Sequence, residues 1–250
     1  CEALATGHYA RRVDGPAGAE LHRAADPARD QSYFLAATTR EQLAFARFPL
    51  GDYPDKASVR AVAARLGLPV AEKPDSQDIC FVPAGRYDSL VGRLRPEAVA
   101  PGEVVHADGR VLGTHAGIAR YTVGQGRGLG EASWDGDERL YVAGVDAGRR
   151  RVVLAPRGAL ESHQATVAEV NWLIDPPAAP RPCTVKLRAR EVPRAAQVAW
   201  DREAGVARVW LESPGIVAPG QACVMYEGDR VLGGGFLRGA GVVDTAPAAA

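Results

Sequence analysis

The segment DSQDICFV, residues 75–82, places one cysteine, Cys80, in a short apolar run that follows four polar residues. At the start of a buried strand a thiol is half enclosed but still reachable from the preceding loop, because successive side chains point to opposite faces. Its thiolate would then be available as a nucleophile. The alternative is that Cys80 is a small core hydrophobe, which is the usual role of a free cysteine.

A reactive Cys80 requires surroundings that favour the charged form of sulfur. Lys73 lies a short distance upstream, and its positive charge would favour the thiolate. The carboxylates of Asp75 and Asp78 would oppose ionisation if they faced the sulfur. We therefore expect both acids to point away from Cys80.

A second polar site is expected near the start of the chain. Residues 2–5 have the pattern of a strand, and Gly7 permits a tight turn directly after it. The α/β sheets place their ligands at the carboxyl ends of strands, so Thr6 and His8 are expected to face a crevice. The alternative is a plain turn with a solvated histidine.

Two helices are predicted between this turn and the cysteine segment. Thr39 and Gln42 have the spacing of a capping box, which predicts a helix that ends near Phe48. Apolar residues at helical spacing predict a second helix between Pro54 and Gly67, packed through its apolar face. The alternation of strand, helix and strand indicates an α/β domain.

From about residue 85 onward the patterns predict strands and turns. Residues 102–115 form a predicted hairpin with Asp108-Gly109 at its turn, and residues 139–156 form a second one. Between them, residues 124–130 are dense in glycine but do not match the dinucleotide-binding pattern GxGxxG and precede no helix. We expect close backbone approach or positive φ angles in this loop instead.

The last part of the chain predicts a small antiparallel barrel, because five short strands alternate with turn residues. Trp200 and Trp210 are expected to fill the barrel. Cys183 and Cys223 lie in these strands, and both are interpreted as core residues.

Composition sets few limits on function. The 250 residues have no formal net charge, 46% hydrophobic and 24% charged residues, as in an ordinary globular protein. An overall basic excess is therefore absent, although phosphate contacts need only a local patch. The sequence has no CxxC pair, signal peptide or bilayer-spanning run, so a cytoplasmic setting is expected. The chain opens at Cys1 inside a predicted strand, and we expect an N-terminal portion to be missing.

Several segments resemble, in the same order, those of the tRNA-specific 2-thiouridylases, a bacterial family with mitochondrial relatives. They are ATGHYAR, RDQSYF, PDSQDICFV, VNW, PGQACVMY and VLGGGF, and DSQDICF is the most specific. The resemblance implies the C-terminal part of an adenine-nucleotide alpha-hydrolase-like PP-loop domain, followed by two small β domains, of which the last is a β-barrel. The corresponding boundaries are 1–84, 85–158 and 159–243, with a disordered tail at 244–250.

The resemblance also implies a reaction. Members of this family use ATP, expected together with Mg²⁺ and without a tightly bound metal, to adenylate the oxygen on carbon 2 of the wobble uridine of tRNA. A cysteine persulfide then supplies sulfur, and a second cysteine helps to release it and leaves a disulfide. Cys80 takes the persulfide role. The implied partners are tRNA and a sulfur donor, either a cysteine desulfurase or a sulfur-relay protein, and no membrane.

Further site residues follow from the same resemblance. Gly7 is expected to approach ATP, and the expected tRNA contacts are His8, Arg29, Asp30, Gln31, Arg188, Ala189 and Gln221. Three positions depart from the family pattern. Arg29 replaces a lysine, which changes the donor geometry. Ala189 replaces a tyrosine and removes a stacking group, and Gly126 replaces an arginine, although Arg127 remains.

The family's ATP loop of the SGGxDS type and its first catalytic cysteine do not occur in these 250 residues. We therefore expect this polypeptide alone to be inactive in thiolation. Two alternatives remain open at this point. One is a non-catalytic RNA-binding protein derived from the family, and the other is a carrier that only accepts a persulfide at Cys80.

Overall fold

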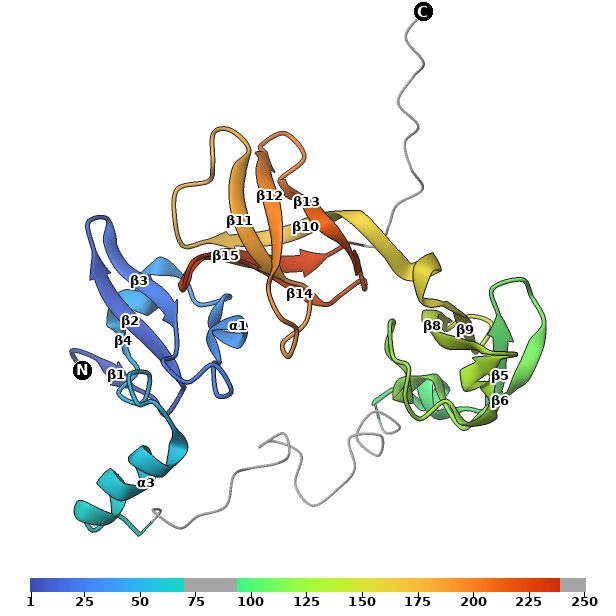
Figure 1. Cartoon of the computed structure of the whole chain (residues 1–250), viewed down its shortest axis with the longest axis horizontal. Helices are drawn as coiled ribbons and strands as arrows, with labels where there is room; N and C mark the ends of the chain where they lie inside the picture. Colours follow the sequence, from blue (N-terminus) through green and yellow to red (C-terminus); the bar gives the residue numbers. More distant parts are fainter. Residues whose placement is uncertain (70–93, 239–250) are drawn as a thin grey trace, which may run out of the picture. The chain divides into compact units, whose positions relative to one another are not determined.

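The computed structural model of the chain describes residues 1–69 and 94–238 (Figure 1). Two compact units divide the chain, and the first unit combines residues 1–73 with residues 162–250. The second unit consists of residues 74–161. The predictions for Cys80, for the charged residues before it and for the tail 244–250 lie outside the described residues.

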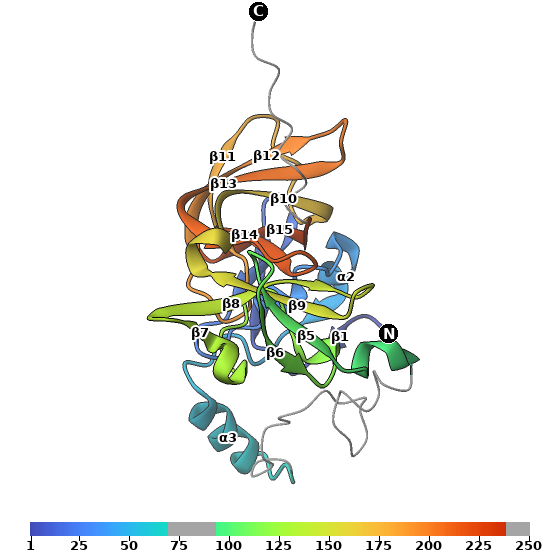
Figure 2. The same cartoon turned by 90° about the vertical axis from the view of Figure 1, so that its right-hand side faces the viewer.

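A closed barrel of six antiparallel strands forms the centre of the first unit (Figure 2). The strands are β10 (Glu161–Trp172), β11 (Arg181–Lys186), β12 (Arg194–Asp201), β13 (Val206–Ile216), β14 (Ala222–Glu227) and β15 (Arg230–Leu237). Their order is β10-β13-β12-β11-β14-β15, and a pairing between β10 and β15 closes the barrel. The predicted barrel is confirmed, and β10 is an additional strand that the sequence patterns did not reveal.

The barrel interior follows the alternation of side chains along each strand. Val185, Val198 and Val209 are buried inside, together with Cys183 and Cys223 as predicted. The prediction that Trp210 fills the barrel is wrong, because this residue is 39% exposed. Its neighbours Val209 and Leu211 take the interior positions of β13, so Trp210 between them must point outward.

Trp200 lies at the border of the barrel core and is partly buried. Its ring packs against Trp172 of β10 in an edge-to-face arrangement, with ring centroids 5.9 Å apart. The first of the two tryptophan predictions is therefore correct in part, since Trp200 covers the core from one side.

Glycine makes the closure between β10 and β15 possible. A Cβ atom at Gly235 would lie 2.4 Å from the carbonyl oxygen of Ala168, and one at Gly233 would lie 2.6 Å from that of Asn171. Any side chain at these positions would push the backbones of the two strands apart. The GGG run in β15 therefore has a structural reason that the sequence alone did not supply.

The N-terminal residues of the chain extend the sheet of the barrel. A hairpin formed by β2 (Ala10–Gly15) and β3 (Gly18–Arg23) joins β15 through the pair Arg230 and His22. The short strands β1 (Leu4–Ala5) and β4 (Ala46–Arg47) pair in parallel beside it. In this unit the predicted α/β portion therefore packs directly against the barrel.

Two short helices cover this contact: α1 (Ser32–Leu35) and α2 (Arg40–Phe45). The capping box at Thr39 is confirmed, because its hydroxyl accepts from the Gln42 amide while the Gln42 side chain accepts from the Thr39 amide. The helix ends earlier than expected. After Phe45 the backbone turns extended to form β4, which satisfies backbone groups in the parallel pair with β1.

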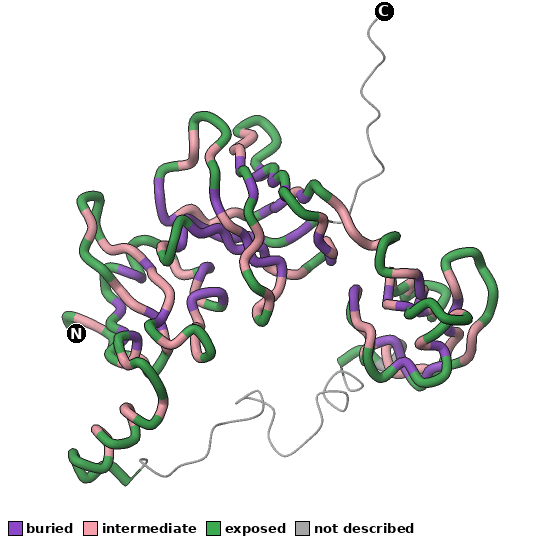
Figure 3. The backbone as a smooth tube through the Cα atoms, in the orientation of Figure 1, coloured by how far each residue is buried: buried purple, intermediate pink, exposed green. Residues whose placement is uncertain are grey.

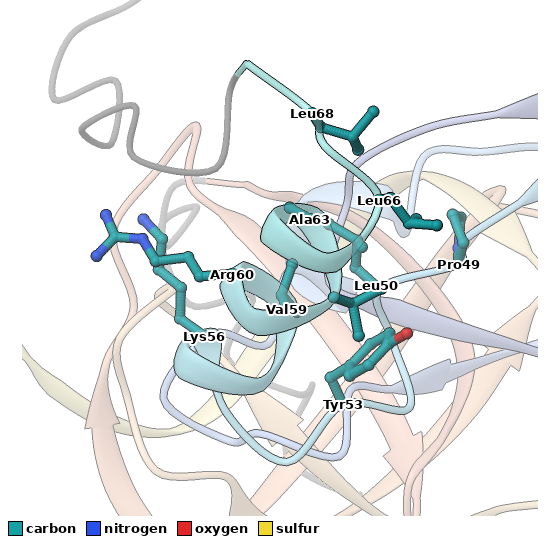
Figure 4. Close-up of a pocket in the computed structure, with 10 residues that line it drawn as sticks. Pro49, Leu50, Tyr53, Lys56, Val59, Arg60, Ala63, Leu66 and Leu68 are labelled. Carbon is teal, nitrogen blue, oxygen red and sulfur yellow. The ribbon is translucent and has the colours of Figure 1, made fainter.

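Helix α3 (Lys56–Arg65) lies between Pro54 and Gly67, as predicted. The structure adds its N-cap, Asp55, and a positive φ of 67° at Gly67. None of its residues is buried (Figure 3). Its apolar side faces an open groove of about 430 Å³, lined also by Pro49, Leu50 and Tyr53 (Figure 4). The expected packing face is therefore open within the described part of the chain.

The second unit is a five-stranded sheet with the order β6-β5-β9-β8-β7. Its strands are β5 (Gly102–His106), β6 (Val111–His115), β7 (Trp134–Asp135), β8 (Glu138–Asp146) and β9 (Arg151–Pro156). Both predicted hairpins are confirmed, and Gly109 at the first turn has a φ of 97°. Three glycines of the loop also have positive φ, as expected: Gly124, Gly128 and Gly130.

The described residues of the first unit form two separate hydrophobic clusters. One fills the barrel, and the other lies between the N-terminal elements and the outer face of β14 and β15. The second cluster includes Tyr33, Leu43 and Phe48 from the N-terminal part and Val224 and Tyr226 from the barrel. We call it the junction cluster. Because it draws on both parts, it fixes the residues near α1 against the barrel.

Candidate functional site

The site is built around Tyr33 of α1, which lies in the RDQSYF segment. Its phenol oxygen donates a 2.8 Å hydrogen bond to the backbone carbonyl of Ala222, the first residue of β14. The side chain is buried in the junction cluster. Burial raises the pKa of the Tyr33 phenol to about 12, and the nearby positive charge of Arg188 lowers it by a smaller amount. Tyr33 therefore stays neutral and acts as a fixed donor.

Asp30, a predicted tRNA contact, shapes the loop that precedes α1. Its Oδ1 accepts from the backbone amides of Ala24 and Ser32, at 3.3 Å and 3.0 Å, and its Oδ2 accepts from the Ser32 hydroxyl at 3.0 Å. Both carboxylate oxygens are thus used inside the chain. The geometry gives Asp30 a positioning role, whatever else it contacts.

Gln31 joins two of the segments that carried the resemblance. The backbone amide of Tyr9 donates to Gln31 Oε1 at 2.9 Å, and the backbone amide of Gln31 donates to the Tyr9 carbonyl at 2.8 Å. This double link sets the ATGHY segment beside the RDQ segment. His8 is exposed there, with its Nδ1 2.9 Å from the Thr6 hydroxyl oxygen, and Arg29 is half-buried in the preceding turn.

The barrel supplies the remaining predicted contacts at the same place. Arg188 and Ala189 follow the end of β11, and Ala189 packs against the junction cluster that contains Tyr33. Gln221 directly precedes Ala222, the acceptor of the Tyr33 hydrogen bond. The structure thus brings the two groups of predicted contacts, 29–31 and 188–221, to one junction although they are far apart in the chain.

Two cations at this junction were not singled out from the sequence. The Arg23 guanidinium lies 4.1 Å above the ring of Tyr226, and the Lys186 ammonium lies 5.8 Å from the ring centroid of Tyr33. Lys186 lies two positions before the predicted contact Arg188, and this proximity was the only sign in the sequence that Lys186 belongs to the site. Arg23 gave none, because its partner Tyr226 comes from the far end of the chain.

Gly7, the predicted ATP contact, is exposed. A Cβ atom built there would meet only the Leu50 side chain, at the ordinary distance of 3.9 Å, and Gly7 is not among the described glycines with positive φ. The chain's own packing therefore does not require glycine at this position. Free space above the backbone is compatible with the approach of a phosphate or a base, and the ATP role stays a prediction.

The glycine loop of the second unit explains one departure from the family pattern. A Cβ atom at Gly126 would lie 2.5 Å from the ring of Tyr141, so a larger residue cannot fit without moving that ring. Arg139 donates a 2.6 Å hydrogen bond to the Gly126 carbonyl, and its guanidinium lies 5.8 Å from the Tyr141 ring and 6.0 Å from that of Trp134. The ring of Tyr141 therefore leaves room only for glycine at position 126.

The other chemical groups in the described residues have simpler roles. Cys183 and Cys223 are free thiols in the barrel core, and burial raises the pKa of Cys183 to about 12 and that of Cys223 still further. Neither is suited to react as a thiolate.

Within residues 1–69 and 94–238, no cluster of His, Cys, Asp and Glu is arranged to hold a metal ion. The helices there are too short or too polar to cross a bilayer.

Three family models match successive parts of the chain. The tRNA methyl transferase HUP domain matches residues 1–84, the tRNA methyl transferase PRC-barrel domain matches residues 90–156, and the aminomethyltransferase beta-barrel domain matches residues 162–237. These matches confirm the expected fold class, which is part of a nucleotide-binding α/β domain followed by two β domains, the last a barrel.

Whole proteins with the same arrangement are similar over nearly all of the chain. A tRNA-specific 2-thiouridylase MnmA from Acidiphilium cryptum is 61% identical over 236 residues, which are 94% of this chain and 66% of the relative. The corresponding proteins from Gluconobacter oxydans and Rhodospirillum centenum are 54% and 56% identical over 241 residues each, covering 66% and 61% of their lengths. The chain thus spans a little under two thirds of the relatives it matches.

Proposed function

The chain belongs to the tRNA-specific 2-thiouridylase family, and on that premise we propose that it supplies the tRNA-binding and sulfur-carrying part of a 2-thiouridylase. The reaction is the replacement of oxygen by sulfur at carbon 2 of the wobble uridine. One observation carries the proposal: the junction around Tyr33 gathers the predicted contacts of the RDQ segment and of the barrel into one surface.

The proposed chemistry assigns the sulfur step to Cys80. ATP supplies the activation, because adenylation turns the oxygen on carbon 2 into a leaving group. The terminal sulfur of the Cys80 persulfide then bonds to carbon 2, and the adenylated oxygen leaves as AMP. A second cysteine attacks the sulfur–sulfur bond, so that the two cysteines end as a disulfide and the new carbon–sulfur bond remains.

In this proposal the residues of the junction hold the RNA. Recognition relies on shape and on single-stranded bases, in keeping with a chain that has no net charge. His8 and Arg188 offer polar contacts. Gln31 holds the segment that carries His8 through its bonds to Tyr9, and Asp30 holds the loop before α1. Extruding the target base costs a few kcal/mol, roughly the loss of its stacking, and contacts of the barrel with the anticodon arm offset that loss.

The further parts of the proposal concern partners. The reaction consumes ATP, expected with Mg²⁺, and Gly7 is the residue of this chain assigned to it. A cysteine desulfurase or a sulfur-relay protein loads Cys80. The setting is the cytoplasm, where tRNA and these donors occur.

The decisive experiment joins residues 1–250 to the part of the Acidiphilium cryptum relative that this chain does not cover, where the SGGxDS-type loop is expected. Mass spectrometry of digested tRNA then measures 2-thiouridine after incubation with ATP and a sulfur donor. Activity is expected, and Cys80→Ser is expected to abolish it. The matched control is Cys1→Ser, which changes an exposed thiol and should leave the product unaffected. Undiminished thiolation by Cys80→Ser would refute the assignment.

The 250-residue chain alone and the joined protein together distinguish the proposal from the two alternatives. We expect the chain alone to bind a tRNA that carries a wobble uridine and to form no 2-thiouridine. If the joined protein with Cys80→Ser still forms 2-thiouridine at the full rate, the result supports the alternative that this chain is a non-catalytic RNA-binding protein. If Cys80 takes up a persulfide but the chain shows no affinity for tRNA, the proposal is wrong and the chain is a persulfide carrier.

A further inference from the structure

Two cations meet where α1 contacts the barrel, and each lies against a tyrosine ring. The Arg23 guanidinium is 4.1 Å above Tyr226, and the Lys186 ammonium is 5.8 Å from the ring centroid of Tyr33. Both rings belong to the junction cluster. The faces of aromatic rings attract cations, which helps to keep two positive charges in this partly apolar place.

The Arg23 guanidinium has donors without acceptors, and Lys186 adds a buried charge beside it. Arg23 Nε and Nη2 are buried and have no hydrogen-bond partner. Lys186 is only 8% exposed, and its ammonium lies against the Tyr33 ring as a second positive charge beside these donors. Buried donors are normally paired, so a partner from outside the described chain is expected here.

The acids near the pair do not supply that partner. Asp30 is close enough to act on Lys186 electrostatically, but both its oxygens already accept hydrogen bonds from Ala24 and Ser32. Glu191 is also near Lys186, but it is bonded to Arg194 at 2.6 Å. The junction therefore has an excess of positive donors, and what it lacks is an anionic acceptor.

We propose that Arg23 and Lys186 form a phosphate site that takes a phosphodiester group of the RNA backbone. The inference rests on the proposed function and adds two residues to it. The location favours RNA over free phosphate, because Arg188, Ala189 and Asp30 of the predicted tRNA surface lie at the same junction. Phosphate oxygens accept from guanidinium and ammonium groups, and the contact fixes the register of the RNA without reading a base.

The test measures tRNA affinity by fluorescence anisotropy at a series of salt concentrations. Lys186→Met removes the charge and keeps an unbranched apolar stem for the buried part of the site. We expect about tenfold weaker binding, as for the loss of one charge-assisted hydrogen bond. The slope of log affinity against log salt should fall by about 0.7 to 0.9, the value for one phosphate contact. Lys186→Arg should restore the slope.

Arg208→Met is the matched control. It removes one positive charge from the same unit, but that guanidinium is already paired with Asp201 at 2.9 Å. Its salt slope should equal that of the unmodified chain. If Lys186→Met also keeps that slope while tRNA still binds, the phosphate site is refuted and the proposed function survives. If the unmodified chain binds no tRNA, the proposed function fails and the inference falls with it.

Two further measurements close the remaining gaps. Titration with inorganic phosphate tests whether the site takes free phosphate instead of RNA. The RNA assignment is overturned if phosphate binds saturably, if Lys186→Met abolishes that binding, and if the salt slope of tRNA binding stays unchanged in Lys186→Met. If Lys186→Met does not fold, the unmodified chain can be labelled with ¹³C at its three lysines, Lys56, Lys73 and Lys186. The Lys186 signal, assigned with Lys186→Arg, should shift when tRNA is added, and a constant signal at saturation would refute the contact.

Discussion

The phenol oxygen of Tyr33 lies 2.8 Å from the carbonyl oxygen of Ala222, across 189 positions of sequence. The first residue belongs to the RDQSYF segment and the second to the PGQACVMY segment of the barrel. A single hydrogen bond thus joins two of the segments that carried the resemblance. Since Asp30 and Gln31 precede the donor and Gln221 precedes the acceptor, this bond sets the spacing of the proposed tRNA contacts.

Tyr33→Phe should lower the free energy of unfolding by about 1–2 kcal/mol, because the ring stays in place while its donor is lost. Urea denaturation followed by circular dichroism measures this loss. Tyr53→Phe is the control, since Tyr53 lines the open groove beside α3 rather than a buried contact. An equal effect of the two substitutions would show that the bond contributes nothing.

The buried thiol of Cys183 should make stability fall at alkaline pH. Its pKa is raised by burial from 9.0 to about 12 in the folded chain. The thiol contributes fully below pH 9, and this contribution is lost as the pH rises from 9 towards 12, at about 1.4 kcal/mol per pH unit. Unfolding free energies at pH 8 to 11 should decline less in Cys183→Ala. Cys1→Ala, at an exposed thiol, should leave the decline unchanged.

The parts of the fold that rest on local signals could be predicted. The capping box at Thr39, the turn at Asp108-Gly109 and the end of α3 before Gly67 each depend on residues within a few positions. Strand alternation likewise predicted the barrel. It did not show which alternate residues point inward in β13, so Trp210 was assigned to the wrong face.

The parts that rest on distant pairs could not be predicted. Four contacts join the two ends of the unit. They are the pairing of β3 with β15, the hydrogen bond of the Tyr33 hydroxyl, the contact of the Arg23 guanidinium with the Tyr226 ring, and the closure by β10. No periodicity within a short window contains that information. The resemblance named tRNA-facing residues, but it did not predict that one cluster gathers them.

Asn171 of the VNW segment should be essential to the junction. Its side-chain amide donates to the carbonyl oxygens of Ala36 and Thr38, at 2.8 Å and 2.9 Å, just after α1. Asn171→Leu removes both bonds, from buried Ala36 and half-buried Thr38, and should lower the free energy of unfolding by about 2–4 kcal/mol. Gln197→Leu, on an exposed face of β12, should change it by less than about 0.5 kcal/mol. Matching effects in urea denaturation would contradict this role.

Gly235→Ala should disrupt the pairing of β10 with β15 that closes the barrel. The added methyl would lie 2.4 Å from the Ala168 carbonyl oxygen, and a backbone atom of the paired strand cannot move aside without breaking the pairing. We expect a loss of about 2–4 kcal/mol in unfolding free energy. Gly113→Ala is the comparison, because a methyl there meets nothing within 4 Å. If Gly235→Ala lowers the free energy of unfolding no more than Gly113→Ala does, the close contact between β10 and β15 is disproved.

The last prediction concerns Ala189, where the family pattern has tyrosine. Ala189 is half-buried beside the junction cluster, directly after Arg188, so an aromatic ring there would border the proposed RNA surface. A base stacked on an aromatic ring gains about 1–3 kcal/mol, and Ala189→Tyr should therefore strengthen tRNA binding by about tenfold. Because stacking is largely uncharged, the salt slope should not change, in contrast to the effect at Lys186. Ala189→Leu adds bulk without a π face and should leave affinity unchanged. If leucine strengthens binding as much as tyrosine, the gain comes from packing, and position 189 does not face a base.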